Sequence, residues 1–460
     1  MAGTGKSTLA KTVCRRIKER SCLGGSFFCS RYDGRRDEMR IIPTLAEQLC
    51  RSVEGFGPEL LRLNGLEDVA SAPVDQLNEL IVAPLLQLSK LVSTIVVVID
   101  ALDECEGSKA AYVLLLALSH TIVRIPALKV FITSRPEREI LNAFERESLA
   151  NMTNILRLDL IPRDEVDCDI GKFFSTRLAR MVMENTGGKE RDDGWPPAPL
   201  IDQLVSVSGG LFIFAHTLCE FAAGAGRMFQ AIIEDYATQT ASDGNDLVAL
   251  DRLYTTILSK NLEKLGGLTG HRGKKCNAVL AMVILLKEPL SVTALNALLG
   301  FNEVFELIDL FRSILFVPDK DNSTEVVRTI HSSLQDLLIS RERLSRVDFS
   351  QMYIDPSTQN RSMVKALWKL MLDNLCRNPC DIIIDPETRD HALVYACRFW
   401  AEHLKSVVNE TSEERQQGTF IEVAQTLQDF VSKKLPNWIE ALSLLQSLEL
   451  AVSALSISRD

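Results

Sequence analysis

The sequence predicts an α/β domain with a parallel sheet, followed by domains that are mostly helical. Residues 94–100 (TIVVVID) and 128–135 (LKVFITSR) are apolar, β-branched runs without regular alternation, which is typical of parallel strands buried on both faces. Helical patterns separate these runs, and strands that alternate with helices indicate a parallel sheet covered by helices. From about residue 164 the strand pattern fades and helical periodicity dominates.

The first third of the chain supplies the elements of the α/β domain. Residues 25–30 (GSFFCS) predict a further short, buried strand. Helical periodicity covers residues 7–20, 43–53, 74–91 and 110–122. Each predicted strand is therefore preceded or followed by a helix that can cover the sheet.

The rest of the chain contains one strand pair among helices. Residues 184–197 are polar and rich in glycine and proline, and they predict a loop between two helices. Residues 314–317 and 326–330 read as short strands, and residues 318–323 (PDKDNS) between them favour a hairpin turn. Helices followed by a small hairpin suit a winged-helix module.

Length and composition narrow the class of protein. A chain of 460 residues is too long for one ordinary core, and it carries 61 acidic against 51 basic residues, a formal net charge of −10. This balance argues against a general nucleic-acid binder. Eleven cysteines without a C-x-x-C pair favour reduced thiols over a zinc site and point to a cytoplasmic protein. We expect no signal peptide and no membrane span, because no apolar run is long enough.

Residues 2–8 (AGTGKST) predict a phosphate-binding loop. Glycines let successive main-chain amides point at one anion, a lysine reaches the β- and γ-phosphates, and the neighbouring hydroxyl holds Mg²⁺. The helix predicted to follow at once turns its positive N-terminal end toward the phosphates. The predicted nucleotide-binding residues are Gly3, Thr4, Gly5, Lys6, Ser7 and Thr8.

The loop departs from the full phosphate-loop pattern, G-x-x-x-x-G-K-[ST]. The first glycine of that pattern would fall one position before Met1, and the strand that normally precedes the loop is absent from the sequence. Taken alone, the segment also fits a glycine-rich N-terminal tail. We expect an N-terminally incomplete or degenerate copy of a phosphate-loop domain that lacks its first strand.

Acidic residues follow the predicted strand 94–100. Ligands bind at the carboxyl ends of parallel strands, where Asp100 could hold Mg²⁺ opposite Ser7. Asp103 or Glu104 could orient or deprotonate the attacking water. The alternative is a cluster of helix-capping acids, because carboxylates favour helix N-termini. The burial predicted for the strand favours the metal-site interpretation.

Arg135 follows the next predicted strand. Its guanidinium is expected at the same edge of the sheet as the phosphates, where it could sense the γ-phosphate. An ordinary surface arginine is the alternative. The order of glycine loop, acidic strand end and arginine favours the site.

These motifs together resemble the NACHT domains of fungal proteins, which belong to the STAND branch of AAA-related ATPases and overlap with the nephrocystin-like N-terminal domain. The resemblance rests on residues 3–10 (GTGKSTLA), 25–31 (GSFFCSR), 97–105 (VVIDALDEC) and 131–137 (FITSRPE). It continues through further segments along most of the chain: 43–49 (PTLAEQL), 208–215 (SGGLFIFA), 288–291 (EPLS), 330–336 (IHSSLQD) and 395–404 (YACRFWAEHL).

The resemblance implies a domain order and further roles. It implies a phosphate-loop NTPase core at 1–160, a helical lid at 161–245, a winged-helix-like domain at 246–345 and a helical domain at 346–460. Lys6 and Ser7 would bind phosphate and Mg²⁺, with Asp100 on the metal, Glu104 or Asp103 assisting hydrolysis, and Arg135 as the sensor. His331 would touch the β-phosphate of bound ADP, although a lone histidine beside an apolar strand is more often a core residue.

The leading functional hypothesis is a nucleotide-operated signalling switch that binds ATP or ADP with Mg²⁺, with GTP as an alternative. ADP would hold it closed, and ATP would favour an open form that forms homo-oligomers and contacts unknown protein partners. A metabolic kinase or transferase is less favoured, because the long helical tail offers no acceptor pocket. A degenerate scaffold that has lost nucleotide binding is the serious alternative.

Overall fold

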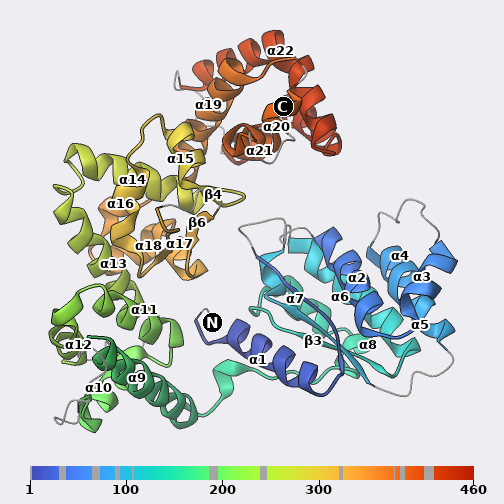
Figure 1. Ribbon diagram of the computed structural model, residues 1–460, viewed down its shortest axis with the longest axis horizontal. Helices are drawn as coiled ribbons and strands as arrows, with labels where there is room; N and C mark the ends of the chain where they lie inside the picture. The colour runs from blue at the N-terminus through green and yellow to red at the C-terminus, as the bar shows by residue number, and fades with distance from the viewer. Residues whose placement is uncertain are drawn as a thin grey trace. The chain divides into compact units, whose positions relative to one another are not determined.

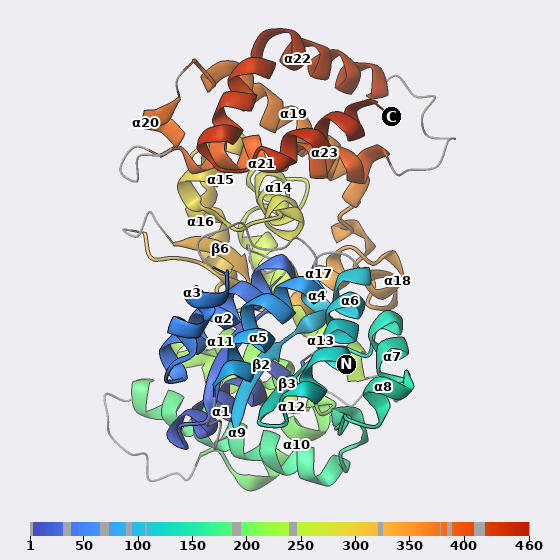
Figure 2. The same ribbon diagram turned by 90° about the vertical axis from the view of Figure 1, so that its right-hand side faces the viewer.

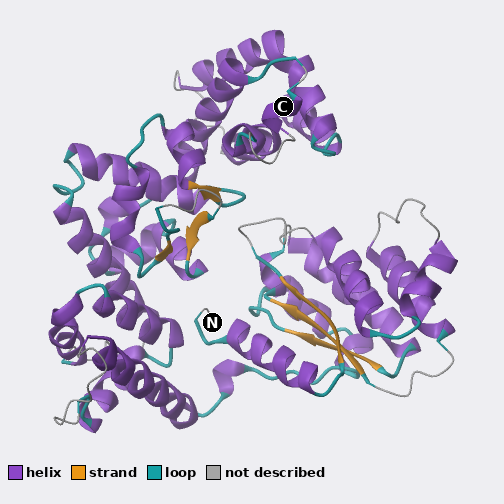
Figure 3. Cartoon of the chain, viewed as in Figure 1, coloured by secondary structure: helices purple, strands orange, loops and turns teal. Residues whose placement is uncertain are grey.

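The structure is a computed structural model that describes most of the chain as two compact units, Met1–Val166 and Asp167–Asp460. The described residues are 3–30, 38–64, 73–88, 94–105, 108–185, 195–238, 246–320, 325–377, 379–383, 389–408 and 419–459. Most of the predicted loop at 184–197 and part of the predicted turn at 318–323 lie outside these ranges. The described residues form mostly helices, with one small parallel sheet in the first unit (Figure 3).

The first unit is built on three parallel strands. Strand β1 (Leu23–Phe28) pairs with β2 (Ile95–Asp100), which pairs with β3 (Leu128–Ile132), so β2 is central. All three predicted strands are therefore confirmed. Because Phe28 lies opposite Asp100 and Ile99 lies opposite Ile132, the residues that follow each strand meet at one edge of the sheet.

Helices cover both faces of this sheet. Figures 1 and 2 show α1 on one face, while α2 and α6 lie on the other. The predicted helix at 74–91 is interrupted by a π-helical segment, Asn78–Val82, and the short helix α3 was not predicted. The helices of this unit are α1 (Lys6–Glu19), α2 (Ile41–Ser52), α3 (Phe56–Asn64), α4 (Pro73–Leu77), α5 (Ala83–Gln87), α6 (Ser108–Thr121), α7 (Arg138–Phe144) and α8 (Glu147–Ala150).

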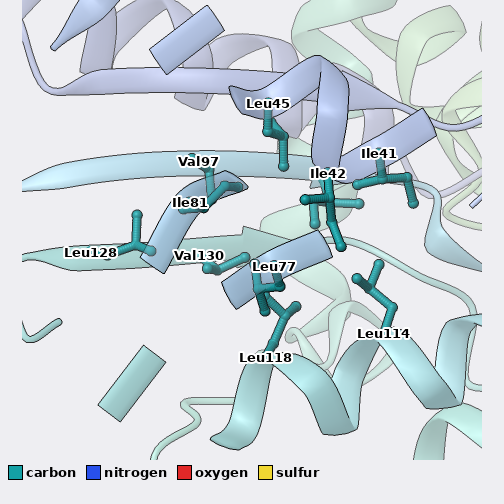
Figure 4. Close-up of a pocket in the computed structure, with 11 residues that line it drawn as sticks. Ile41, Ile42, Leu45, Leu77, Ile81, Val97, Leu114, Leu118, Leu128 and Val130 are labelled. Carbon is teal, nitrogen blue, oxygen red and sulfur yellow. The ribbon is translucent and has the colours of Figure 1, made fainter. Parts of the chain in front are cut away.

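The core lies between β2, β3 and the helices α2, α4 and α6. Figure 4 shows Leu77 and Leu118 pointing toward each other close to Val130 of β3, and these residues, Leu45 and Val97 line one pocket. They surround a cavity of about 10 Å³, which is too small to be more than a packing defect. This close packing fixes the position of the central strand, and with it the acidic residue at its end.

Burial differs between the two later strands. On β2, successive residues Val97 and Val98 are 3% and 0% exposed, so both faces of this strand are covered, as predicted. On β3, only Leu128 is fully buried, and the strand ends at Ile132 rather than at Arg135. The prediction that 128–135 is a strand buried on both faces is therefore wrong in part. Among the described residues β3 pairs on one side only, which leaves it less covered.

The second unit is helical, with a small antiparallel sheet of order β4-β6-β5. The predicted strand pair is confirmed as β5 (Leu315–Phe316) and β6 (Val326–Thr329), and β4 (Leu290–Ser291) was not predicted. The longer helices are α9 (Arg163–Asn185), which crosses the unit boundary, α10 (Ala198–Ser208), α11 (Phe212–Ala223), α12 (Phe229–Ala237), α13 (Asp246–Lys264), α14 (His271–Leu285), α15 (Val292–Leu299), α19 (Pro356–Asn374), α21 (His391–Val408), α22 (Thr419–Leu444) and α23 (Glu449–Arg459). The shorter ones are α16 (Val304–Ile308), α17 (Ser332–Leu338), α18 (Arg341–Arg346) and α20 (Cys380–Ile383).

A buried polar network joins α19 and α21 of this unit. The Asn360 side-chain NH₂ group donates to the Pro356 carbonyl at 2.7 Å. The Asn360 side-chain oxygen, Oδ1, accepts from His403 Nδ1 at 2.6 Å. His403 Nε2 then accepts from the Tyr395 hydroxyl at 2.7 Å, and that oxygen accepts from the Lys287 amide at 2.9 Å. Each donor in this chain of hydrogen bonds meets an acceptor, which explains how the fully buried His403 is tolerated.

No helix in the described part of the chain is both long and apolar enough to cross a membrane.

Candidate functional site

The glycine loop enters α1 through two left-handed residues. Gly3 has φ 80° and Gly5 has φ 86°, a conformation that side chains disfavour and that glycine adopts freely. Gly5 is the N-cap of α1, and no side chain caps the helix there. Main-chain amides of the first turn therefore face the position where a helix N-terminus attracts anions. Ser7 and Thr8 follow in the first turn, and both are exposed.

Lys6, the first residue of α1, is partly buried at the carboxyl edge of the sheet. Burial lowers the pKa of Lys6, and the nearby charge of Arg135 lowers it further. Asp103 opposes this most strongly, and Asp100 and Glu104 raise the pKa as well. A charged group shifts the pKa of another group appreciably only when the two lie close together. Residues predicted from three separate motifs therefore lie around one ammonium group.

Asp100 is the last residue of the central strand and is 2% exposed. The Thr133 hydroxyl donates to its Oδ1 at 2.5 Å. The same hydroxyl accepts from the Ala101 amide at 3.0 Å, so Thr133 fixes both the carboxylate and the turn that follows it. Ala101 has φ 54° and ψ 48°, a left-handed conformation that is strained for a residue with a side chain.

Asp103 is bound to the end of the neighbouring strand. Its Oδ1 accepts from the Arg135 amide at 2.8 Å, and its Oδ2 lies 3.3 Å from Arg135 Nε. The Asp103 side chain is 2% exposed, against 20% for Arg135. Both oxygens thus contact Arg135, which orients the guanidinium and leaves the more exposed Glu104 as the other carboxylate of the turn.

Thr133 was missed as a functional candidate. It stands two residues before Arg135, and a hydroxyl at the end of a strand beside an acidic strand end is the signal that could have identified it. Only the pairing of β2 with β3 shows that this hydroxyl reaches Asp100.

His331 lies in the second unit, where it caps α17. Its Nδ1 accepts from the Ser333 amide at 3.1 Å and lies 2.8 Å from the Ser333 hydroxyl, which in turn is 2.8 Å from the Tyr254 hydroxyl. Because a main-chain N–H can only donate, Nδ1 is the acceptor, and the neutral ring carries its proton on Nε2. The predicted contact of His331 with a phosphate stays a prediction.

The residues at the sheet edge offer oxygen donors of the kind that Mg²⁺ prefers, a carboxylate on Asp100 and a hydroxyl on Ser7. Within the described ranges, no group of three or more histidine, cysteine or acidic side chains is arranged to hold a metal ion. A Mg²⁺ ion that arrives with a nucleotide needs only one or two protein ligands, because phosphate oxygens and water complete its shell. The donor set therefore fits a nucleotide-borne ion better than a resident one.

Two comparisons with known proteins give matches for this chain. Residues 1–135 match the family model described as nephrocystin 3, N-terminal. The chain is also 24% identical over 387 residues to the vegetative incompatibility protein HET-E-1 of Podospora anserina. That match covers 78% of this chain but spans about a quarter of the relative's length, 26%. These two matches support the resemblance to fungal NACHT-domain proteins that the sequence motifs indicate: the first 135 residues are similar to the nephrocystin 3 N-terminal family, and most of the chain is similar to a fungal vegetative incompatibility protein.

Proposed function

We propose that this protein is a signalling switch that binds ATP or ADP with Mg²⁺ and hydrolyses the triphosphate slowly. One observation carries the proposal: Lys6 stands on a left-handed glycine turn at the N-terminus of α1, among Asp100, Asp103, Glu104 and Arg135. GTP would fit the same phosphate chemistry, because the residues assigned here would contact only the phosphates and the metal ion, which ATP and GTP share.

The charges at this edge suit a nucleotide that arrives with a divalent cation. Among the described residues, Lys6, Arg135 and the three acidic side chains beside them sum to one formal negative charge, which by itself would repel a polyphosphate. A bound Mg²⁺ reverses that sign. In this proposal Asp100 and Ser7 hold the ion, and Lys6 binds the β- and γ-phosphate oxygens together with main-chain amides of the glycine loop.

The two carboxylates of the turn take different roles. Asp103 has both oxygens on Arg135, so we assign it to positioning that guanidinium, which senses the γ-phosphate. Glu104 is more exposed than Asp103 and so more accessible to water, and we assign it to the attacking water. The proposal thus chooses between the two carboxylates that the sequence left as alternatives.

The second unit supplies the conformational part of the proposed switch. We assign residues 161–245 to a helical lid, 246–345 to a winged-helix-like domain and 346–460 to a helical domain. The antiparallel sheet β4-β6-β5 among short helices supports the winged-helix assignment. In this view His331 recognises ADP, and the triphosphate form associates with other copies of the chain.

Substitution of Lys6 tests nucleotide binding directly. Lys6→Met should abolish binding of Mg·ATP and Mg·ADP in calorimetric titration, because the phosphate-binding charge is lost. The fold should persist, since burial disfavours the charged lysine and methionine has no charge to desolvate. Lys11→Met, an exposed position on the same helix, is the matched control and should bind like the parent.

Two results would contradict the proposal. If neither the parent nor Lys11→Met binds nucleotide, the protein is a non-catalytic scaffold, which is the main alternative. If Lys6→Met binds as tightly as the parent, the glycine loop is an ordinary helix start and the nucleotide lies elsewhere.

A further inference from the structure

Two cysteines far apart in the sequence meet at the carboxyl edge of the sheet. The Cys105 thiol donates a hydrogen bond to Cys29 Sγ, with the sulfur atoms 3.3 Å apart across 76 residues of chain. Both cysteines are free thiols. Cys29 is 5% exposed, and Cys105 is partly exposed.

Main-chain hydrogen bonds hold both residues in place. Cys29 follows β1 directly, and its amide donates to the Asp100 carbonyl at 2.9 Å, which continues the ladder between β1 and β2. Cys105 ends the short turn Leu102–Glu104, and its amide donates to the Leu102 carbonyl at 3.3 Å. The contact between the thiols therefore follows from the strand register and from the strained turn at Ala101.

We propose that Cys29 and Cys105 form a thiol–disulfide site that reacts with peroxides, and that its closure restrains the turn carrying Glu104. The Cys105 sulfur attacks one peroxide oxygen, the O–O bond breaks, and one water leaves as a sulfenic acid forms. The Cys29 sulfur then attacks the sulfenic sulfur and expels a second water. Two thiols lose two electrons and two protons in total, and the peroxide is reduced to two waters.

The surroundings decide the order of these steps. Cys29 is 5% exposed, so a peroxide in solution reaches it less readily than Cys105. The more exposed Cys105 meets the peroxide first. Because the two sulfur atoms are already in contact, the second step is intramolecular. No thiol from solution has to take part. A disulfide requires the sulfurs to approach to about 2.05 Å, a shift of about 1 Å that rotation at Cys105 can largely provide.

Formation of the disulfide would restrict the movement of the neighbouring carboxylate, that of Glu104. Cys105 is covalently next to Glu104, so a bond to the end of β1 limits the movement of the residue assigned to the attacking water. Lys6 and the glycine loop lie on a different element, so phosphate contacts are not directly affected. This effect on hydrolysis rests on the proposed function, whereas formation of the disulfide does not.

Disulfide mapping tests the site itself. The full chain is treated with hydrogen peroxide, blocked with an alkylating agent, digested without reductant and analysed by mass spectrometry. We expect a linked peptide pair containing Cys29 and Cys105 that dithiothreitol separates. Cys105→Ser and, separately, Cys29→Ala should remove that pair, and the exposed-site control Cys50→Ser should keep it. Circular dichroism confirms that each variant is folded. The site is refuted if Cys105 accumulates as a sulfinic acid or pairs with another cysteine while Cys29 stays alkylated.

Hydrolysis measurements test the consequence. Oxidation should lower the hydrolysis rate of the parent at least about threefold and reversibly, with the affinity for Mg·ATP unchanged within about twofold, as expected when only a reacting group is displaced. Cys105→Ser should hydrolyse at the same rate with and without peroxide. A linked parent that hydrolyses as fast as the reduced one overturns the restraint on Glu104. A chain that forms the disulfide but never hydrolyses nucleotide refutes the proposed function and leaves the thiol site standing.

Discussion

At the scale of single residues, one turn of the chain gives two neighbouring carboxylates, those of Asp103 and Glu104, different surroundings. Asp103 and Glu104 are adjacent in sequence, yet Asp103 is the more buried of the two and contacts Arg135 through both of its oxygens. The left-handed Ala101 directs the turn so that Asp103 points toward the end of β3. Chemical type alone could not separate these residues, and their contacts do.

This difference predicts opposite outcomes for two substitutions. Asp103→Ala should destabilise the first unit by about 3 kcal/mol, because it leaves the mostly buried Arg135 without its partner carboxylate. Glu104→Gln should change the free energy of unfolding by less than about 0.5 kcal/mol and keep nucleotide affinity, but slow hydrolysis by about 100-fold. Urea unfolding and a phosphate-release assay measure the two effects. The assigned roles are wrong if Glu104→Gln unfolds as easily as Asp103→Ala, or if it hydrolyses at the parent rate.

At the scale of elements, the pairing of β2 with β3 builds the site. The register puts Thr133 next to Asp100, and one hydroxyl then serves as donor to the carboxylate and acceptor for the Ala101 amide. A polar side chain at the end of a strand is normally exposed to solvent. Here Thr133 is 7% exposed, so the loss of either hydrogen bond would leave a poorly solvated polar group.

Thr133→Val should therefore weaken both the turn and the proposed metal site. The isosteric change removes the hydroxyl and leaves the Ala101 amide without its acceptor, which should destabilise the unit by about 1–3 kcal/mol. The apparent affinity for Mg·ADP should fall severalfold, since Asp100 loses the donor that orients it. Thr133→Ser keeps the hydroxyl and is the matched control. Chemical denaturation and titration calorimetry with both variants check this, and equal behaviour of Val and Ser would show that the hydrogen bonds contribute little.

At the scale of the whole molecule, the proposed switch needs a contact that differs between the ADP and ATP forms. A ligand shifts an equilibrium only by its differential affinity for the two states. His331 is the proposed source of that difference, and the structure gives it a local role as well, because it caps α17. Any test of His331 must separate the two roles.

Two substitutions at this position make the separation. His331→Ala removes both the cap and the imidazole, whereas His331→Asn keeps a side-chain oxygen that can cap the helix. If the imidazole binds the β-phosphate, both variants should weaken ADP by about 10- to 100-fold relative to ATP, the value of a hydrogen bond to a charged group. Size-exclusion chromatography with ADP should then show more oligomer than for the parent. If His331→Asn binds ADP and elutes like the parent, His331 is a helix cap only.

The sequence by itself determined the order of strands and helices and the residue types of the site. Apolar runs predict buried strands because burial on two faces removes the need for polar alternation, and β2 shows this with both of its faces covered. The glycine loop, Asp100 and Arg135 could be identified as candidates because phosphate-binding sites of the proposed kind use those residue types in that order. The partial exposure of β3 could not be predicted from the sequence, because the burial of a strand depends on which strands lie beside it.

Only the tertiary structure decided which of these side chains act together. The contacts between Thr133 and Asp100, between Asp103 and Arg135, and between Cys29 and Cys105 span 33, 32 and 76 residues. Each depends on strand register and on the left-handed turn at Ala101, and a one-residue shift in a strand would turn its side chains to the other face. Local patterns in a sequence report the conformation of a segment, whereas the partners of a side chain depend on how distant segments pack.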